Sequence, residues 1–162
     1  MRIIKLAIIS FIFLFLLITI ISLFIPSHVR ISKAININAE KDSLFALIAD
    51  TGNWYRWHPA YRQTSTNSGQ NKIIISPRLS NDSLISMQLS LPEKNSIVSS
   101  WQVYQNSSSD SLTLQWYLDF NLKWYPWEKF GSLLYEEKYG TMMQTGLSNL
   151  KEITERPSSI FD

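Results

Sequence analysis

Residues 111–124 read SLTLQWYLDFNLKW, and they contain the longest alternation of apolar and polar side chains in the protein. From Leu112 to Leu122 every second residue is leucine, tryptophan or phenylalanine, whereas most residues between them are polar. A period of two is typical of a β-strand that turns one face towards a core. The segment therefore predicts a long strand that buries Trp116 and its same-face neighbours.

Shorter segments with the same period precede this strand. We expect them to form strands at residues 29–37, 61–66, 72–77, 84–91 and 97–104, which makes six with the long strand. Short turns rich in asparagine, serine, glycine and proline separate the strands after residue 60. Strands connected in this way form an antiparallel meander.

Two short helical regions are predicted before the meander. Residues 40–50 gather apolar side chains on one face, and we expect a helix there with Asn38 as its N-cap and Gly52 as its C-terminal stop. The aromatic segment 53–59 is predicted to add a helical turn that ends at Pro59.

A long helix is predicted near the C-terminus, where apolar residues recur every three or four positions. Its stripe contains Met143, Leu147 and Leu150. A curved meander has a concave apolar face that must be covered, and this helix is the one predicted element long enough to cover it. The sequence thus predicts an α+β domain in which the sheet packs against the C-terminal helix.

The segment from Leu6 to Ile25 has twenty residues and no charged side chain. A helix of that length measures about 30 Å, the thickness of the hydrocarbon core of a bilayer. The alternative is a secretory signal peptide, but its apolar region is about 7–15 residues long and ends in small residues. We therefore predict an uncleaved transmembrane anchor in residues 1–26. Its lipid-facing side chains are expected to include Leu6, Phe11, Phe15, Ile20 and Ile25.

The distribution of charge indicates the surroundings of the protein. Two of the 15 Lys and Arg residues, Arg2 and Lys5, lie in the anchor just before its uncharged run, so the remaining 13 balance the 13 Asp and Glu residues. The basic residues are scattered, which argues against nucleic-acid binding. Arg2 and Lys5 on one side of the anchor, against Arg30 and Lys33 on the other, favour a cytoplasmic N-terminus only slightly. We expect a single-pass protein of the cytoplasmic (inner) membrane with its domain on the outer, periplasmic side.

Four short motifs resemble those of the START-related superfamily (SRPBCC), which includes polyketide cyclase/dehydrase-like and lipid-transfer proteins. Residues 29–39 resemble the opening strand of that family, and residues 43–50 resemble its first helix. The segment 53–59, NWYRWHP, matches the pattern N-W-x-x-W-x-P, and residues 146–151, GLSNLK, resemble the closing G-L-x-x-L-K helix. The motifs occur in the order of the family and extend over about residues 29–155.

The resemblance implies a helix-grip fold, in which a curved antiparallel sheet of about six strands is clasped by the C-terminal helix. The helix-grip domain would comprise residues 27–156, between the anchor and a tail of residues 157–162. The implied role is binding or carrying a lipid or another hydrophobic small molecule, as a membrane-anchored bacterial member of the family. A polyketide cyclase/dehydrase-like enzyme and a non-catalytic interaction module with a filled core are the alternatives. Of these, we expect a protein that is not an enzyme.

The sequence lacks the motifs of several enzyme classes. Its five glycines form neither a dinucleotide-binding motif nor a P-loop, and it has no cysteine for a thiolate site. His28 and His58 have no partner at metal-ligand spacing, so we expect no metal and no cofactor. His58 is predicted to be a helix-end or surface residue rather than a general base. Asp50 is predicted to cap a helix end or to bond the following turn, and Asp119 to face water.

Aromatic side chains indicate where an apolar ligand would bind. All six tryptophans and all seven tyrosines follow Asp50. Pockets lined by aromatic rings and flexible methionines suit lipids and ring compounds, whereas the alternative is a packed core of the same side chains. For Trp124, Tyr125 and Trp127 a further alternative is insertion into the membrane interface. The expected cavity residues are Trp57, Trp101, Trp116, Phe120, Met142, Met143 and Leu147.

Overall fold

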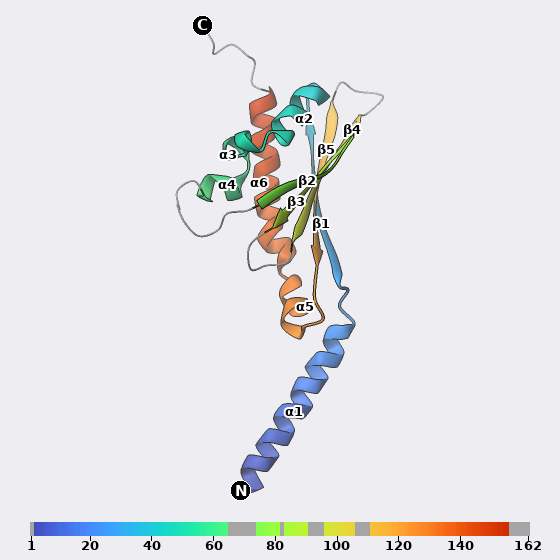
Figure 1. Ribbon diagram of the computed structural model, residues 1–162, viewed down its shortest axis with the longest axis vertical. Helices are drawn as coiled ribbons and strands as arrows, with labels where there is room; N and C mark the ends of the chain where they lie inside the picture. The colour runs from blue at the N-terminus through green and yellow to red at the C-terminus, as the bar shows by residue number, and fades with distance from the viewer. Residues whose placement is uncertain (1, 65–73, 82, 91–95, 106–110, 156–162) are drawn as a thin grey trace.

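The computed structural model describes residues 2–64, 74–81, 83–90, 96–105 and 111–155. Its helices are α1 (Arg2–Leu23), α2 (Lys41–Ala49), α3 (Trp54–Trp57), α4 (Pro59–Thr64), α5 (Pro126–Ser132) and α6 (Tyr135–Glu155). A 3-10 turn, η1 (Thr51–Asn53), joins α2 to α3. The strands are β1 (His28–Ile37), β2 (Ile74–Ser80), β3 (Leu84–Ser90), β4 (Ile97–Gln105) and β5 (Leu112–Asn121). Figure 1 shows that α1 projects away from a domain formed by the sheet and the other helices.

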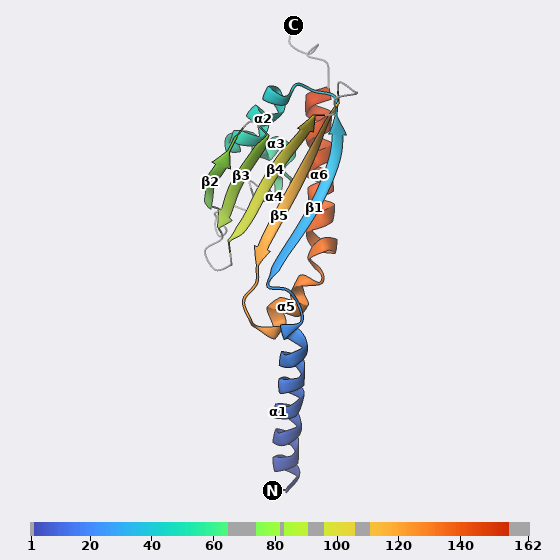
Figure 2. The ribbon, with the colours of Figure 1, turned by 90° about the vertical axis from the view of Figure 1, so that its right-hand side faces the viewer.

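The five strands form one antiparallel sheet in the order β1-β5-β4-β3-β2. Strands β2 to β5 are a meander, and β1 is added at its edge, where His28 pairs with Asn121 and Ile37 with Leu112. The predicted alternation of β5 is confirmed, because the side chains expected on the core face are buried. Figure 2 shows the open face of the sheet, with α6 behind it.

Helix α6 covers the inner face of the sheet, as the sequence predicts. It buries the predicted stripe Met143, Leu147 and Leu150, together with two glycines. Helices α2 to α4 lie on the same side of the sheet (Figure 1). This is the predicted α+β architecture of a curved antiparallel sheet and a long C-terminal helix, preceded by a long apolar N-terminal helix.

Three local predictions are wrong. The described sheet has five strands instead of six, because Tyr61–Thr64 belong to α4 rather than to a strand. Pro59 occupies the first position of α4, where its fixed φ favours a helix. The other expected hairpin residues before Ile74 lie outside the described residues. Asn38 is not the N-cap of α2, because Glu40 occupies that position without a side-chain capping bond. Gly52 does not end α2, because the helix stops at Ala49 with Asp50 as its C-cap and Gly52 lies in η1.

Helix α1 is the one helix of the described residues that is long and apolar enough to cross a membrane. Its length and composition fit a membrane span or a signal sequence. The helix ends at Leu23, so the predicted lipid-facing Ile25 follows it. The other expected lipid-facing side chains are exposed on α1: Leu6, Phe11, Phe15 and Ile20.

Candidate functional site

Four tryptophans occupy the centre of the inner face. Trp101 of β4 pairs with Trp116 of β5, and their rings stack with centroids 5.5 Å apart. The ring of Trp57 on α3 meets the edge of Trp116 at 6.0 Å, and Trp54 meets Trp101 at 5.4 Å. All four side chains are fully buried. Indole rings therefore fill the space between α3 and the middle of the sheet.

His58 follows α3 and packs into this tryptophan cluster. Its ring stacks almost parallel on Trp54 with centroids 5.2 Å apart, and lies equally close to Trp116. The predicted helix-end position is confirmed, but a surface position is wrong, because only 4% of the residue is exposed. Burial lowers the pKa of His58 to about 4. The imidazole is consequently neutral near pH 7 and a weak base.

Polar atoms around the tryptophan cluster fall into two groups. Trp54 Nε1 donates to the carbonyl of Ile48, and Trp116 Nε1 donates to Ser99 Oγ, both at 2.8 Å. Within the described part of the chain, four other buried atoms have no hydrogen-bond partner: Trp57 Nε1, His58 Nδ1, Tyr61 Oη and Trp101 Nε1. A buried polar atom without a partner costs about 1–3 kcal/mol. These atoms are therefore suited to bind internal water or a polar group of a ligand.

The predicted cavity residues come together in one core cluster. Six of them are buried, and Met142 is half-buried against the same cluster. Trp57, Trp101 and Trp116 contact one another through their rings. Phe120 is set apart from them, because it lies towards the end of β5 that is near α1. Of the seven, Phe120 lines the pocket described next.

A pocket of about 290 Å³ lies between the end of β5 and the beginning of α6. Its apolar surface includes Phe120 and the rings of Tyr135 and Tyr139, whose centroids lie 4.7 and 4.9 Å from that of Phe120. Figure 1 shows that this end of the sheet is the end from which α1 projects. Sequence reasoning missed the two tyrosines, although they lie four positions apart and so share one side of α6.

The rim of this 290 Å³ pocket carries charge. Lys123 and Lys138 line it, together with Glu128. Glu128 Oε2 accepts a hydrogen bond from the backbone N–H of Lys123 at 2.7 Å, and Lys138 Nζ lies 5.3 Å above the ring of Tyr139. Burial raises the pKa of Tyr139, so its phenol is neutral at physiological pH. The pocket thus combines an aromatic floor with a rim that has an excess of lysine.

A larger pocket, of about 730 Å³, lies at the opposite end of the sheet. Its lining consists of residues 38–42 together with Gln105 and Leu112. Most of these side chains are polar or charged. Two of its seven lining residues are apolar, whereas five of the ten that line the 290 Å³ pocket are apolar or aromatic, so the 290 Å³ pocket is the better candidate site for an apolar ligand.

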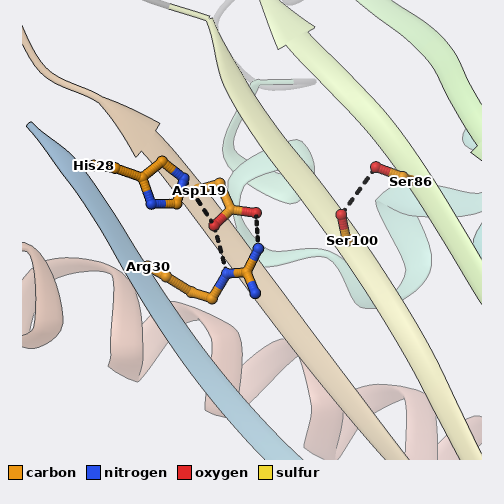
Figure 3. Close-up of polar contacts among 5 residues, drawn as sticks. All are labelled: His28, Arg30, Ser86, Ser100 and Asp119. Carbon is orange, nitrogen blue, oxygen red and sulfur yellow. Dashed lines mark hydrogen bonds and ion pairs between the residues drawn. The ribbon is translucent and has the colours of Figure 1, made fainter.

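The outer face of the sheet contains a buried carboxylate (Figure 3). Asp119 Oδ1 accepts a hydrogen bond from Arg30 Nε at 2.6 Å, and His28 Nε2 lies 3.5 Å away. The predicted exposure of Asp119 is wrong, because Arg30 on β1 pairs with it across the strands and leaves its side chain 11% exposed. Asp50 behaves as predicted and accepts a hydrogen bond from the N–H of Gly52. Among the described residues, no three His, Cys, Asp or Glu side chains are grouped to hold a metal ion.

Comparisons with known proteins identify the fold. A scan against models of protein families found no match, and the sequence matched no curated protein. Among solved structures, the chain is similar to a START superfamily protein from Mycobacterium smegmatis, with 13% identity over 78% of this chain and 97% of that one, and a TM-score of 0.55. It is also similar to the Zhui aromatase/cyclase from Streptomyces sp. R1128, with 12% identity over 80% and 94% of the two chains and a TM-score of 0.56. At these identities the similarity shows the fold, which is that of START and polyketide-cyclase proteins.

Proposed function

We propose that this protein is a membrane-anchored module that binds and carries a hydrophobic small molecule or lipid. The observation that carries the proposal is the position of the 290 Å³ pocket, which is lined by Phe120, Tyr135 and Tyr139 at the end of the domain nearest α1. An apolar ligand dissolved in a bilayer would meet a pocket held there more often than one held at the far end of the sheet.

Contacts of the domain with the end of α1 and with the residues that follow it support an uncleaved anchor. Lys129 Nζ donates to the carbonyl of Ile25 and to Ser27 Oγ, both at 2.7 Å, and Lys129 is itself buried. Ser22, near the end of α1, is also fully buried. A segment destined for removal has no need of a buried lysine that binds its C-terminal end. These contacts therefore favour a membrane anchor over a signal peptide.

The size and lining of the pocket indicate the class of ligand. A volume of about 290 Å³ is at the lower end of the range of small-molecule pockets, about 300–1,000 Å³. It fits part of an acyl chain or a small ring system against Phe120 and the tyrosines. Lys123 and Lys138 at the rim suit a polar or acidic head group. The proposed ligand is thus an amphiphile with a short apolar body.

Photo-crosslinking in the full-length protein tests the ligand. A benzophenone amino acid replaces Tyr139, which lines the pocket, or Tyr55, which is exposed on α3. We expect mass spectrometry after irradiation in membranes to detect one recurrent lipid or ring compound on the probe at 139, absent from the probe at 55. Ser96→Trp, which fills the pocket, should remove the adduct, whereas Ser83→Trp outside the pocket should not. No adduct at 139, or the same adducts at both positions, would contradict the proposal.

The domain is proposed to lie on the outer side of the cytoplasmic membrane. The weak excess of positive charge at the N-terminal end of α1, from Arg2 and Lys5, and the absence of cysteine support this orientation. An enzymatic reporter fused after Asp162 should be active if it requires the periplasm and inactive if it requires the cytoplasm. The opposite pattern would reverse the orientation and leave ligand binding untouched.

A cyclase-like enzyme is the second candidate, because the fold is similar to that of an aromatase/cyclase. In addition, the buried Nδ1 of His58 has no hydrogen-bond partner. We expect no catalytic role for His58, since a base with a pKa of about 4 removes protons poorly. If turnover of an aromatic polyketide is detected, His58→Ala should leave it largely intact. A loss of about a hundredfold, as for a true general base, would support the enzyme instead.

A further inference from the structure

Helix α5 buries two polar side chains and turns its large apolar side chains outward. The residues it buries are Pro126, Lys129 and Ser132, spaced three apart. Trp127 and Phe130, on the other side of the helix, are exposed. A helix on the surface of a water-soluble domain shows the reverse arrangement. The outward side of α5 is therefore suited to an apolar environment.

The flanking residues extend this apolar side into a patch. We define the patch as Trp124, Trp127, Phe130, Leu133 and Leu134, and four of the five are 63–65% exposed. Outside α1 and the adjoining Phe24, Tyr55 and Tyr104 are the other large hydrophobic residues exposed in the described part of the chain. The exposed apolar surface of the domain is thus concentrated at α5 instead of being scattered.

The patch is fixed beside the end of α1. Lys129, on the buried side of α5, donates hydrogen bonds to the carbonyl of Ile25 and the hydroxyl of Ser27. The N–H of Leu122, just before the patch, donates to the carbonyl of Ser27 at 2.7 Å. Figures 1 and 2 both show α5 next to the end of α1 that joins the domain. The patch therefore lies at the level where α1 would leave the hydrocarbon.

The chemistry of the patch fits the interface of a bilayer. Tryptophan rings are favoured at the level of the head groups, and Tyr125 stacks on Trp127 with centroids 4.8 Å apart and planes at 7°. The exposed Lys123 and Lys138 flank the patch, at positions where long cationic side chains can reach phosphates. Rings, leucines and flanking lysines beside a membrane span are the components of an interfacial segment.

We propose that residues 124–134 are a second membrane contact, which inserts into the interface of the bilayer beside α1. This inference rests on the proposed function, because it requires that α1 spans the membrane. Glu128 and Tyr135, in and next to the segment, also line the 290 Å³ pocket. Insertion of the patch holds the rim of that pocket among the lipid head groups, so an amphiphile enters it without crossing water.

The absence of cysteine makes a site-specific test direct. An environment-sensitive NBD fluorophore is attached to full-length protein at Trp127→Cys, Leu134→Cys, Tyr55→Cys or Leu14→Cys. Each variant is reconstituted in vesicles of phosphatidylcholine and phosphatidylglycerol. The replaced side chains are exposed, so the domain core is unchanged. We expect the labels at 127 and 134 to emit at shorter wavelength than the label at 55, with several-fold weaker quenching by aqueous iodide and strong quenching by lipids spin-labelled near the head group.

The label at Leu14 separates this inference from the proposed anchor. If it lies in the hydrocarbon while the labels at 127 and 134 behave like the label at Tyr55, the second contact is wrong and the anchor stands. If the label at Leu14 is itself in water, both are wrong. Labels at 127 and 134 that are shielded from iodide but not quenched by spin-labelled lipids would indicate a protein, such as a second copy of the chain, and would also overturn the inference.

Discussion

Gly146 of α6 lies directly against the ring of Trp116, so that a Cβ atom added at Gly146 would lie 2.8 Å from Cζ3 of the indole. The same Cβ would lie 3.2 Å from Cδ of Pro59. Trp116 cannot move easily, since it is stacked on Trp101 and hydrogen-bonded to Ser99. The absence of a side chain at Gly146 is therefore what allows α6 to approach the sheet.

Gly146→Ala is expected to destabilise the domain. Alanine favours a helix by about 1 kcal/mol over glycine, but overpacking of a rigid core costs about 1–3 kcal/mol, so we expect a net loss of roughly 1 kcal/mol. Thermal unfolding in detergent measures it. Gly131→Ala in α5 is the matched control, because nothing lies within 4 Å of its Cβ and stability should stay equal or rise. Equal stability gains in both variants would show that α6 is not in close contact with Trp116.

His58 should make stability depend on pH. Its pKa is about 4 in the folded protein and about 6.5 when unfolded, so below pH 6.5 the unfolded chain binds a proton that the folded protein does not. The free energy of unfolding is therefore not reduced by His58 above pH 6.5. It falls by up to about 3 kcal/mol between pH 6.5 and 4, and His58 changes it no further below pH 4.

His58→Phe, which retains an aromatic ring against Trp54, should remove this part of the pH dependence. Urea unfolding at a series of pH values measures the effect. His28→Gln is the control, because His28 is exposed, and it should leave the fall between pH 6.5 and 4 in place. Identical pH curves for wild type and His58→Phe would contradict the assignment.

Lys129→Met should loosen the junction between α1 and the domain. The substitution keeps an unbranched side chain but leaves the carbonyl of Ile25 and the hydroxyl of Ser27 without their donor. We expect a loss of about 2 kcal/mol in domain stability, typical of hydrogen bonds to a charged group, and faster proteolysis between residues 24 and 28. Lys123→Met, at an exposed lysine, should have little effect on either measurement. Equal protease resistance of the two variants would argue against a specific role for Lys129.

The ion pair of Arg30 and Asp119 should contribute measurably to stability. A double-mutant cycle with Arg30→Met and Asp119→Asn is expected to give a coupling energy of about 1 kcal/mol, since the carboxylate is mostly shielded while the guanidinium is half exposed. The cycle for Lys33 and Glu136, where the carboxylate is exposed, should give less than about 0.5 kcal/mol. A larger coupling for the exposed pair would contradict this ranking.

Local patterns predicted much of the fold, whereas contacts between distant residues caused the errors. The alternation in residues 112–122 and the helical stripe through Met143 each arise within one strand or helix, from the side of it that is buried. Asp119 was expected in water because the alternation assigns it to the outer face, but its shielding depends on Arg30, 89 positions earlier. The assignment of Tyr61–Thr64 to a strand overlooked the tendency of Pro59 to begin a helix.

The candidate site was less accessible to sequence reasoning than the fold. Aromatic composition indicated an apolar interior, and the predicted residues do meet there. The 290 Å³ pocket, however, depends on how Tyr135 and Tyr139 on α6 meet Phe120 across the end of the sheet. The sequence indicates part of the patch at α5 through Trp124, Tyr125 and Trp127. Its connection to α1 through Lys129 requires a contact over more than 100 positions, which no local pattern encodes.

The pairing of β1 with β5 joins two strands that leave the ribosome at different times. β1 begins five positions after α1 ends, whereas its partner strand is completed at residue 121. The ribosome therefore delivers the apolar helix and the first strand long before the strand that satisfies its backbone groups. During that interval the nascent edge can join to foreign strands. Residues 28–37 therefore keep unpaired backbone groups along this edge until residue 121 has been synthesised.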